Sequence, residues 1–346
     1  MQVLIVKTSS LGDVVHTLAA VTDAARMIPG IRFDWVVEEA FAEVPRWHPS
    51  VDRVIPIAIR RWRHAPWQAV RSGEWRQFRR LLRARQYDAV IDAQGLVKSA
   101  LVTWQARGPR YGLDRAGARE PLASLGYQHR LQVPKGGHAI TRLRQLFAKA
   151  LVYPELKGRA DFGIDRSRLP LPLSDGPFLV FLQGTTWASK HWPEPYWVEL
   201  ARLAAAHGFQ VWLPWGSTAE LHRAERIAAT NTNARVLERM TLTEVGGVLA
   251  GAAGVVGVDT GLAHLGAALE VPGVTLYGPT TPGLTGASGS RQRNLSAHFP
   301  CAPCLQRQCR YLGPSDVEPA CYQTLPPERV LAELKAIMAQ TPDPLR

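Results

Sequence analysis

Residues 1–17 read MQVLIVKTSSLGDVVHT, and this stretch decides the fold of the first half of the chain. The apolar run at 3–6 predicts a buried strand, the polar residues after it a loop, and the apolar spacing from residue 13 a helix. Many nucleotide and sugar-phosphate sites begin with a strand, a short glycine-containing loop and a helix. The stretch lacks G-x-G-x-x-G and G-x-x-x-x-G-K-[ST], so it is neither a dinucleotide fingerprint nor a P-loop. Asp13 is therefore either a helix cap or a chemical group at the rim of a sheet.

The alternation of strand and helix continues along the whole chain. Strands are expected at 3–6, 33–37, 53–57, 87–92, 178–182, 209–213, 254–258 and 274–277. Helices are expected near 13–27, 67–86, 97–106, 194–206, 217–230, 241–250, 261–269 and 327–339. Apolar strands separated by helix-length segments favour parallel sheets that are covered on both faces. The predicted fold class is α/β, with two doubly wound Rossmann-like domains facing each other across a cleft.

A proline-rich stretch divides the two halves. Residues 165–177, DRSRLPLPLSDGP, contain three prolines and little periodicity, which is typical of a linker. At 346 residues the chain is long enough for two domains, each with its own core. The expected division is 1–165 for the first domain, 166–177 for the linker, 178–325 for the second domain and 326–346 for a C-terminal helix and tail.

The composition is that of a soluble globular protein, with 46% hydrophobic and 20% charged residues. No stretch approaches the roughly 18 consecutive apolar residues of a membrane span. The N-terminus begins as a strand and lacks the basic and apolar regions of a signal peptide. We therefore expect a cytoplasmic location.

The net charge of +12 is unevenly distributed. Residues 1–150 contain 24 Lys and Arg against 12 Asp and Glu, whereas residues 151–346 contain 17 of each. Such asymmetry indicates that the first half meets an anionic partner, either nucleic acid, a membrane surface or a phosphorylated substrate. A merely solvated basic surface is the alternative.

All four cysteines fall within a short segment near the C-terminus. They are Cys301, Cys304, Cys309 and Cys321. Four thiols at this spacing suit a structural zinc site. The alternatives are free thiols in a reducing compartment, or thiols that pair only after cell lysis.

Two loops of the second half that follow predicted strands carry groups suited to a nucleotide. Thr185, Thr186 and Lys190 follow the strand at 178–182, where hydroxyls and an ammonium can bind phosphate oxygens. The alternative for this loop is an ordinary surface turn with a solvated lysine. Glu220 follows the next strand near a helix start, where its carboxylate can accept from ribose hydroxyls or cap the helix.

The loop after the strand at 254–258 is the most informative. Asp259 ends that strand, Thr260 and Gly261 open a helix, and His264 lies in its first turn. Backbone N–H groups at such a helix start form an anion site, which would stabilise charge on a diphosphate without a metal. The alternative is an ordinary N-cap with a packed histidine.

Three motifs carry a resemblance to a known family. VDTGLAHLGAAL (258–269), TSSLGDVVHT (8–17) and YGPTTPGL (277–284) resemble the ADP-heptose:lipopolysaccharide heptosyltransferases. Further stretches resemble the members that add the first heptose, namely FDWVVEEAFAEVP, RVIPIAIRRWR, YDAVIDAQGLVKSALVT, AREPLASL and KHWPEPYW. The resemblance runs from residue 1 to about 285 and thins afterwards.

The resemblance implies a GT-B glycosyltransferase whose first domain binds the acceptor and whose second binds the nucleotide sugar. It implies transfer of L-glycero-D-manno-heptose from ADP-heptose to the first Kdo of Kdo2-lipid A, with inversion at the anomeric carbon. The reaction builds the lipopolysaccharide inner core at the cytoplasmic face of the inner membrane, so peripheral membrane contact is expected. Neither a catalytic metal nor a cofactor is expected.

The resemblance also implies roles for individual residues. Asp13 matches the family's general base, which removes the proton of the acceptor hydroxyl. Residues that match acceptor-binding positions are Ser9, Ser10, Gly12, Arg60, Arg61, Arg63, Arg119, His138 and Arg142. Residues that match donor-binding positions are Thr185, Thr186, Lys190, Glu220, Met240, Asp259, Thr260, Gly261, Leu262 and His264. Among these, Lys190 also supplies the positive charge that other sugar transferases obtain from a metal.

Three other functions compete with this interpretation. A heptosyltransferase that adds the second heptose is the nearest, and the AIRRWR and AREPLASL stretches argue against it. A nucleic-acid-binding module would explain the charge, but the arginines lack stacking aromatic platforms or a recognition helix. A nicotinamide dehydrogenase would need the G-x-G-x-x-G motif.

Overall fold

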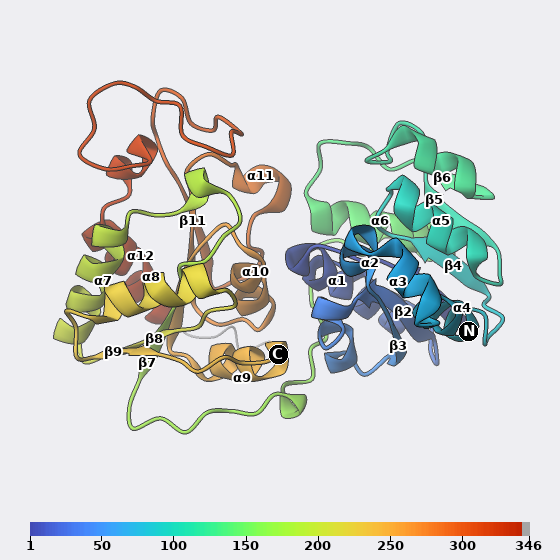
Figure 1. The fold of residues 1–346 in the computed structure, drawn as a ribbon, viewed down its shortest axis with the longest axis horizontal. Helices are drawn as coiled ribbons and strands as arrows, with labels where there is room; N and C mark the ends of the chain where they lie inside the picture. Colours follow the sequence, from blue (N-terminus) through green and yellow to red (C-terminus); the bar gives the residue numbers. More distant parts are fainter. Residues whose placement is uncertain (341–346) are drawn as a thin grey trace. The chain divides into compact units, whose positions relative to one another are not determined.

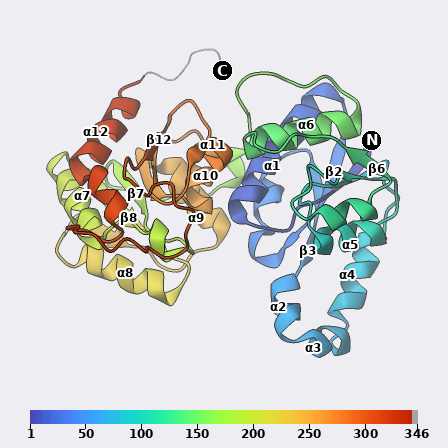
Figure 2. The same cartoon turned by 90° about the horizontal axis from the view of Figure 1, so that it is seen from above.

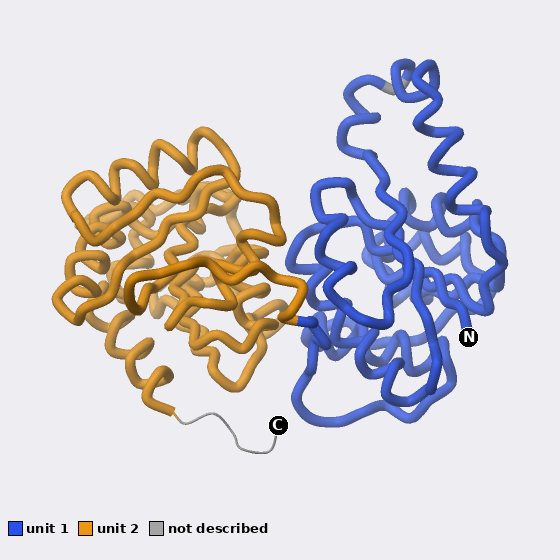
Figure 3. Tube along the Cα trace, turned by 90° about the horizontal axis from the view of Figure 1, so that it is seen from below, with its two compact units in different colours: residues 1–165 blue, residues 166–346 orange. Residues whose placement is uncertain are grey.

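The structure is a computed structural model that describes residues 1–340. The chain divides into two compact units, Met1–Asp165 (unit 1) and Arg166 onward (unit 2), drawn in blue and orange in Figure 3. Each unit is built around its own parallel sheet of six strands. Figure 1 shows helices packed around the strands of each unit. The expected α/β class with two doubly wound sheets is confirmed.

Unit 1 contains a sheet in the order β3-β2-β1-β4-β5-β6. The strands are β1 (Gln2–Val6), β2 (Arg32–Glu38), β3 (Val51–Ile57), β4 (Ala89–Asp92), β5 (Arg110–Leu113) and β6 (His129–Leu131). All neighbouring pairs are parallel. The order of connection reverses between β1 and β4, and ligands of doubly wound sheets bind beyond the strand ends at such a switch point.

Helices cover both faces of this sheet. They are α1 (Leu11–Met27), α2 (Ile59–His64), α3 (Pro66–Arg71), α4 (Glu74–Leu82), α5 (Val97–Gln105) and α6 (Ala139–Leu151), with 3₁₀ turns η1 (Glu39–Phe41), η2 (Val44–Trp47) and η3 (Pro121–Gly126). Phe78 of α4 and Val102 of α5 pack with Val36 on one face. Phe147 of α6 contacts Phe33 on the other, because residues 33 and 36 of a strand point to opposite faces. Helix α1 packs against α6 and shares its face.

Unit 2 repeats the same plan with the order β12-β11-β10-β7-β8-β9. The strands are β7 (Phe178–Leu182), β8 (Gln210–Leu213), β9 (Ala234–Val236), β10 (Gly254–Val258), β11 (Gly273–Tyr277) and β12 (Gln292–Ser296). The helices are α7 (Glu194–Ala206), α8 (Thr218–Ala228), α9 (Leu242–Gly251), α10 (Gly261–Ala268), α11 (Pro282–Thr285) and α12 (Pro327–Met338), with η4 (Arg166–Arg168), η5 (Ala188–Lys190) and η6 (Ala320–Thr324). The reversal of connection falls between β7 and β10, so this unit's switch point lies there.

The predicted helix over 67–86 is wrong in its extent. It is two helices, α3 and α4, separated at Gly73, whose φ of 77° lies in the left-handed region that favours glycine. Figure 2 shows α2, α3 and α4 as a helical arm that projects from the rest of unit 1. Sequence patterns also did not reveal α2, α6 and the strands β5, β6, β9 and β12, of which three are only three or four residues long.

The proline-rich stretch after Asp165 packs onto unit 2. Arg166 donates to the carbonyl of Ala250 at 3.1 Å. A Cβ atom at Gly247 of α9 would lie 1.8 Å from the carbonyl oxygen of Pro170, so only glycine permits this contact. The expected tail at 341–346 lies outside the described residues. Within 1–340, none of the helices has the length and apolar character needed to cross a bilayer.

Candidate active site

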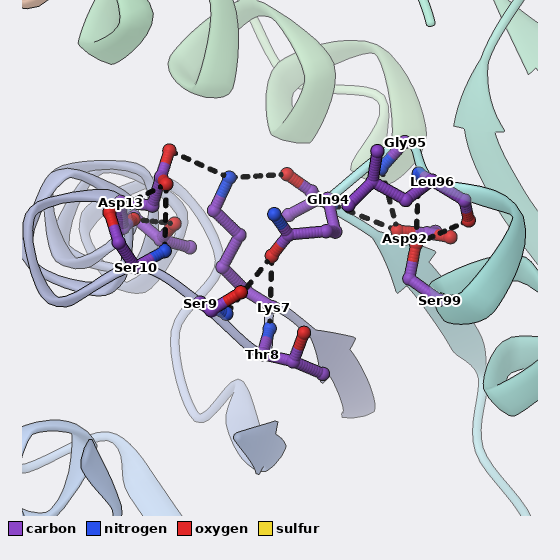
Figure 4. Close-up of polar contacts among 12 residues, drawn as sticks. Lys7, Thr8, Ser9, Ser10, Asp13, Asp92, Gln94, Gly95, Leu96 and Ser99 are labelled. Carbon is purple, nitrogen blue, oxygen red and sulfur yellow. Dashed lines mark hydrogen bonds and ion pairs between the residues drawn. The ribbon is translucent and has the colours of Figure 1, made fainter. Parts of the chain in front are cut away.

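The carboxylate of Asp13 lies at the switch point of unit 1 and has two kinds of partner, as Figure 4 shows. Its Oδ2 accepts from the backbone N–H of Ser10 at 2.8 Å and from the Ser10 hydroxyl at 3.0 Å. These contacts make Asp13 a capping residue in the first turn of α1. Its Oδ1 lies 3.4 Å from Nζ of Lys7. Capping and an ion pair therefore coexist, and the Asp13 side chain stays 32% exposed.

Lys7 is a functional candidate that the sequence analysis did not single out. Its side chain is only 7% exposed, and Nζ also donates to the carbonyl of Ala93 at 3.0 Å. A buried ammonium needs such partners, because an unpaired charge inside a protein is costly. A lysine directly after an apolar strand in a polar loop is the only sequence signal of this role.

The environment sets the protonation state of Asp13. Burial alone would raise the pKa of this carboxyl. The Lys7 ammonium and the N–H of Ser10 outweigh burial, with a smaller contribution from His16, and hold the pKa below its usual range. Asp13 is therefore ionised at neutral pH and able to accept a proton.

A fully buried carboxylate, Asp92, shapes the loop beside Asp13. Asp92, at the end of β4, accepts from the N–H groups of Gln94 and Gly95 at 2.8 and 3.0 Å and from the Tyr127 hydroxyl at 2.7 Å. Burial raises the pKa of Asp92 despite these hydrogen bonds. The Gln94 side chain in turn accepts from the N–H groups of Thr8 and Ser9. The loop after β4 thus fixes the loop after β1, as expected of two strands that flank a switch point.

Of the small residues predicted around Asp13, Ser9 and Ser10 make these loop contacts, and Gly12 is buried in the first turn of α1. His138 lies near this helix because its ring is 5.9 Å from that of His16, between centroids. Its Nδ1 accepts from the N–H of Ile140 at the start of α6. The structure therefore brings His138 to the same edge of the sheet as Asp13.

The three arginines of α2 have different surroundings. Arg60 is exposed, and its backbone N–H donates to the buried Glu38 carboxylate at 2.9 Å. Arg61 pairs with Glu39 and Glu74 at 3.1 and 2.9 Å, which raises the pKa of its guanidinium. Arg63 is exposed, and no partner is seen for its guanidinium among residues 1–340. The charge of Arg61 is therefore largely compensated, whereas that of Arg63 is available for a ligand.

Arg119 and Arg142 differ in the contacts that their side chains make. The N–H of Arg119 approaches Gly95 beside Gln94, and its side chain is exposed. The guanidinium of Arg142 donates to the carbonyls of Gly117 and Pro134 at 2.7 and 3.0 Å. Arg142 therefore holds loops of unit 1 together, a use that the sequence did not reveal.

An ion pair also occupies the switch point of unit 2. Nζ of Lys190, after β7, lies 2.6 Å from Oδ2 of Asp259, at the end of β10. The Thr280 hydroxyl donates to the same oxygen at 2.8 Å, and the His264 ring lies 3.8 Å from Oδ1. Thr185 donates to the Asp259 carbonyl at 3.4 Å. Thr280 lies within the motif YGPTTPGL (277–284), but the sequence analysis did not single out this residue.

Several predicted donor residues line the loops around this pair. Thr260 is the N-cap of α10, and Gly261 and Leu262 form its first turn, all three half-buried. Thr186 is exposed in the loop after β7. The structure thus brings the Lys190 loop and the start of α10 together, with backbone N–H groups available to an anion.

Glu220 acts as a helix cap, one of its two expected uses. Its Oε2 accepts from the N–H groups of Gly216 and Ser217 at 2.7 and 3.2 Å. The carboxylate also lies so close to Gly184 that a Cβ there would be 2.4 Å from Oε1. Glu220 therefore borders the loop after β7. Met240 is half-buried beyond β9, in a loop tied to the one after β8 by Trp215, which donates to the Leu237 carbonyl at 2.7 Å.

The four cysteines line one cavity of about 370 Å³ in unit 2 and are free thiols. Within residues 1–340, no group of three or more metal-ligating side chains is arranged to hold a metal ion. The expectation of a zinc site therefore finds no support, and the free-thiol alternative describes the structure. Burial, followed by the neighbouring thiols, raises the pKa of Cys321 to about 12, which makes this thiol unreactive.

Two Rossmann-like sheets, each with a charged cluster at its switch point, agree with the class of two-domain GT-B glycosyltransferases. Comparison with solved structures supports this class. The chain is similar to E. coli heptosyltransferase WaaC with ADP, with 52% identity and a TM-score of 0.83, covering 86% of this chain and 93% of that one. It is similar to WaaC with ADP-2-deoxy-2-fluoro heptose, with 46% identity and a TM-score of 0.84 over 97% and 99% of the two chains.

The chain belongs to glycosyltransferase family 9 (heptosyltransferase), whose model matches residues 75–313. It is 54% identical to lipopolysaccharide heptosyltransferase 1 of Pseudomonas aeruginosa, over 100% of both chains. Identity to lipopolysaccharide heptosyltransferase 2 of Escherichia coli is 28%, over 98% of this chain and 99% of the relative. The higher identity favours a heptosyltransferase 1 over a heptosyltransferase 2. Beyond residue 285, where the resemblance was expected to thin, the family model continues to residue 313 and the match to the Pseudomonas relative covers the whole chain, whereas the match to heptosyltransferase 1 of Escherichia coli K12 covers 84% of it.

Proposed function

We propose that this heptosyltransferase transfers L-glycero-D-manno-heptose from ADP-heptose to the first Kdo of Kdo2-lipid A, with inversion of the anomeric carbon. The observation that carries the proposal is the ionised, partly exposed carboxylate of Asp13 at the switch point of unit 1. The similarity to a solved heptosyltransferase with a fluorinated ADP-heptose supports the donor. The identity to heptosyltransferase 1 relatives supports the acceptor.

Asp13 is the general base of the proposed reaction. Its carboxylate takes the proton of the Kdo hydroxyl while that oxygen forms a bond to the anomeric carbon of heptose. The bond from the anomeric carbon to the diphosphate oxygen breaks on the opposite face, and ADP leaves. A lowered pKa weakens a base in its ground state. The hydroxyl becomes acidic as its oxygen bonds to the electron-poor anomeric carbon, so an ionised carboxylate suffices.

Lys190 is the cation of the donor site. Its Nζ pairs with Asp259 at 2.6 Å, so a bound diphosphate would compete with Asp259 for this ammonium. Thr185, Thr186 and the start of α10 supply further donors to phosphate oxygens. Negative charge that grows on the departing diphosphate is stabilised by these groups, and the reaction is proposed to need no metal.

The acceptor residues of the proposal are Arg60, Arg63, Arg119 and His138, with Ser9, Ser10 and Gly12 shaping the loop. Phosphates of lipid A and carboxylates of Kdo match the positive charge of unit 1. Arg61 and Arg142 support this surface through contacts to Glu39, Glu74 and backbone carbonyls. Because the acceptor is a membrane lipid, we place the enzyme at the cytoplasmic face of the inner membrane, as a peripheral protein.

A choice between two acceptors tests the proposal. The purified protein is incubated with ADP-heptose and either Kdo2-lipid A or its singly heptosylated product, and transfer is followed by mass spectrometry. Transfer to Kdo2-lipid A alone is expected. Preference for the heptosylated lipid would assign the protein to the second step instead.

A further inference from the structure

Unit 1 exposes a group of large apolar side chains on two packed elements, α5 and η3. They are Val97, Leu101 and Trp104 of α5 and Leu122 and Leu125 of η3. Trp104 is 63% exposed and both leucines of η3 are 69% exposed. We call this set the α5–η3 surface. Soluble proteins expose single apolar side chains routinely, but a group of this kind marks an interaction site.

The exposure follows from how α5 packs. Val102 of α5 and Ala106, directly after it, are buried in the core on one face of the sheet, and Ala100 is buried against Ala123 of η3 and Tyr127, directly after it. Residues 97, 101 and 104 follow the i, i+4, i+7 spacing and form one stripe on the helix. The fold therefore uses the other sides of α5, and the stripe contributes nothing to the core of unit 1.

Basic residues outnumber acidic ones around the α5–η3 surface, where the exposed Glu120 accepts from the N–H of Val97 at 2.7 Å. Lys98 lies within α5, Arg107 follows its end, and Arg119 precedes η3. Helix α4, which packs on the same face of the sheet as α5, and the residue after it expose four arginines. These are Arg76, Arg79, Arg80 and Arg83. A partner for this region must be apolar at its centre and anionic around it.

We propose that the α5–η3 surface docks onto an anionic lipid bilayer, a proposal that rests on the proposed lipid acceptor. A bilayer with acidic headgroups offers both features, since apolar side chains enter the interface while arginines meet phosphates. Tryptophan favours this interfacial depth. Helix α5 starts directly after the Gln94 loop, so docking holds the Asp13 site near the membrane surface where the acceptor's sugars lie.

Vesicle binding tests the surface without any substrate. Wild type, the double variant Leu122→Ser/Leu125→Ser and Trp104→Ser are floated with phosphatidylethanolamine vesicles that contain phosphatidylglycerol. We expect binding to fall about tenfold or more in each variant, given the free energy of burying a large apolar side chain. Wild type should bind phosphatidylcholine vesicles weakly and lose binding at high salt. The matched control, Leu171→Ser/Leu173→Ser, removes exposed leucines of unit 2 and should bind like wild type.

Activity assays separate this proposal from the proposed function. The variants should raise KM for Kdo2-lipid A presented in vesicles, while KM for a deacylated, soluble acceptor and for ADP-heptose stays at the wild-type value. If wild type transfers no heptose but the variants still lose vesicle binding, the docking surface stands and the proposed function fails. Unchanged melting temperatures confirm that each variant is folded.

Three results would overturn the docking proposal. The first is wild-type vesicle binding in the α5–η3 variants. The second is an equal loss of binding in the unit 2 control. The third is a wild-type dimer that Trp104→Ser converts to a monomer without any vesicle binding, which would make the surface an interface between copies of the chain.

Discussion

The two switch points of the molecule share a lysine and an aspartate but present them in opposite ways. In unit 1 the lysine, Lys7, is 7% exposed and its partner Asp13 is 32% exposed. In unit 2 the lysine, Lys190, is 15% exposed and its partner Asp259 is 9% exposed. The two sheets share the same plan of strand order, but the less buried charged group is a carboxylate in unit 1 and an ammonium in unit 2. The first suits a base for an acceptor hydroxyl, and the second suits a cation for a diphosphate.

The difference arises from the strands that carry the two groups. In unit 1 Lys7 directly follows β1, whereas Asp13 comes after the polar loop, in the first turn of α1. In unit 2 Asp259 directly follows β10 and is held by Thr280, while Lys190 reaches it from the longer loop after β7. In each pair the residue nearest the strand end is the more buried one, by a wide margin in unit 1 and by a narrow one in unit 2. Position relative to the strand end thus decides which charge a ligand meets.

The largest effect is expected from breaking the unit 1 pair at its exposed member. Asp13→Ala and Asp13→Asn should lower kcat by about 10²–10⁴, the range of a general base, and leave the KM for ADP-heptose near wild type. Steady-state transfer with both substrates saturating measures this. Ser10→Ala, which loses one hydroxyl contact to Asp13, is the control and should retain most activity. A loss below about tenfold for Asp13→Ala would leave the residue only as a helix cap.

The less buried member of the unit 2 pair, Lys190, comes next. Lys190→Ala should raise the KM for ADP-heptose and lower kcat by about 10²–10³, because charge grows on the departing diphosphate. A chelator such as EDTA should change the wild-type rate little. Strong, reversible inhibition by the chelator would contradict the assignment and indicate a metal at the diphosphate.

The arginines of α2 sharpen the division of labour between the units. Arg63→Ala should raise the acceptor KM about ten- to a hundredfold, the usual value of charge-assisted contacts to phosphate or carboxylate, and leave the donor KM unchanged. Arg61→Ala should have a smaller effect, because Glu39 and Glu74 already compensate its charge. Initial rates with each substrate varied in turn measure both constants. Equal changes in the two KM values would place Arg63 at the nucleotide.

Breaking the unit 1 pair at its buried member should act mainly through pH. Lys7→Met removes the charge that lowers the Asp13 pKa, so this pKa rises and the acid limb of the kcat/KM profile moves to higher pH. At neutral pH the carboxylate is ionised in both proteins, and the rate should differ less than about tenfold. The same pair also affects stability. Because the pKa of Asp13 is lower in the folded than in the unfolded chain, its ionised carboxylate stabilises the fold above the unfolded pKa, and this stabilisation is lost as the pH falls through the folded pKa. The difference in free energy of unfolding between wild type and Lys7→Met should therefore shrink in acid, which urea unfolding at several pH values would detect. An acid limb at the same pH in Lys7→Met and wild type would show that Lys7 does not set the pKa of Asp13.

The smallest effect is expected at the cysteines. Cys304→Ser should transfer heptose at the wild-type rate, and protein purified without added metal should contain much less than one equivalent of zinc by elemental analysis. Loss of transfer in a folded Cys304→Ser protein would show that the cysteine segment acts at the site. Cys321 is buried in the core of unit 2, so its substitution tests stability rather than chemistry.

The sequence singled out charged residues at the two switch points where a short motif contains them. Asp13, Lys190 and Asp259 were each identified from a short loop after a strand, and the structure gives each of them a charged partner. The sequence analysis missed residues whose contacts are with residues far away along the chain. Gln94 contacts Thr8 and Ser9 across 85 or more residues, and no local pattern announces a glutamine that accepts two backbone N–H groups.

By itself the sequence determined the two parallel sheets, because buried strands and amphipathic helices depend on local hydrophobic spacing. It also determined the family, through motifs that lie in single loops. The tertiary structure decided which side chains from distant parts of the chain contact one another. Strand order placed Lys7 and Gln94 beside the Asp13 loop, and Thr280 beside Asp259, since neighbours in a doubly wound sheet are distant in the chain. It also decided that Arg61 is compensated while Arg63 is available, because ion pairs depend on where Glu39 and Glu74 lie in space rather than on the arginine motif.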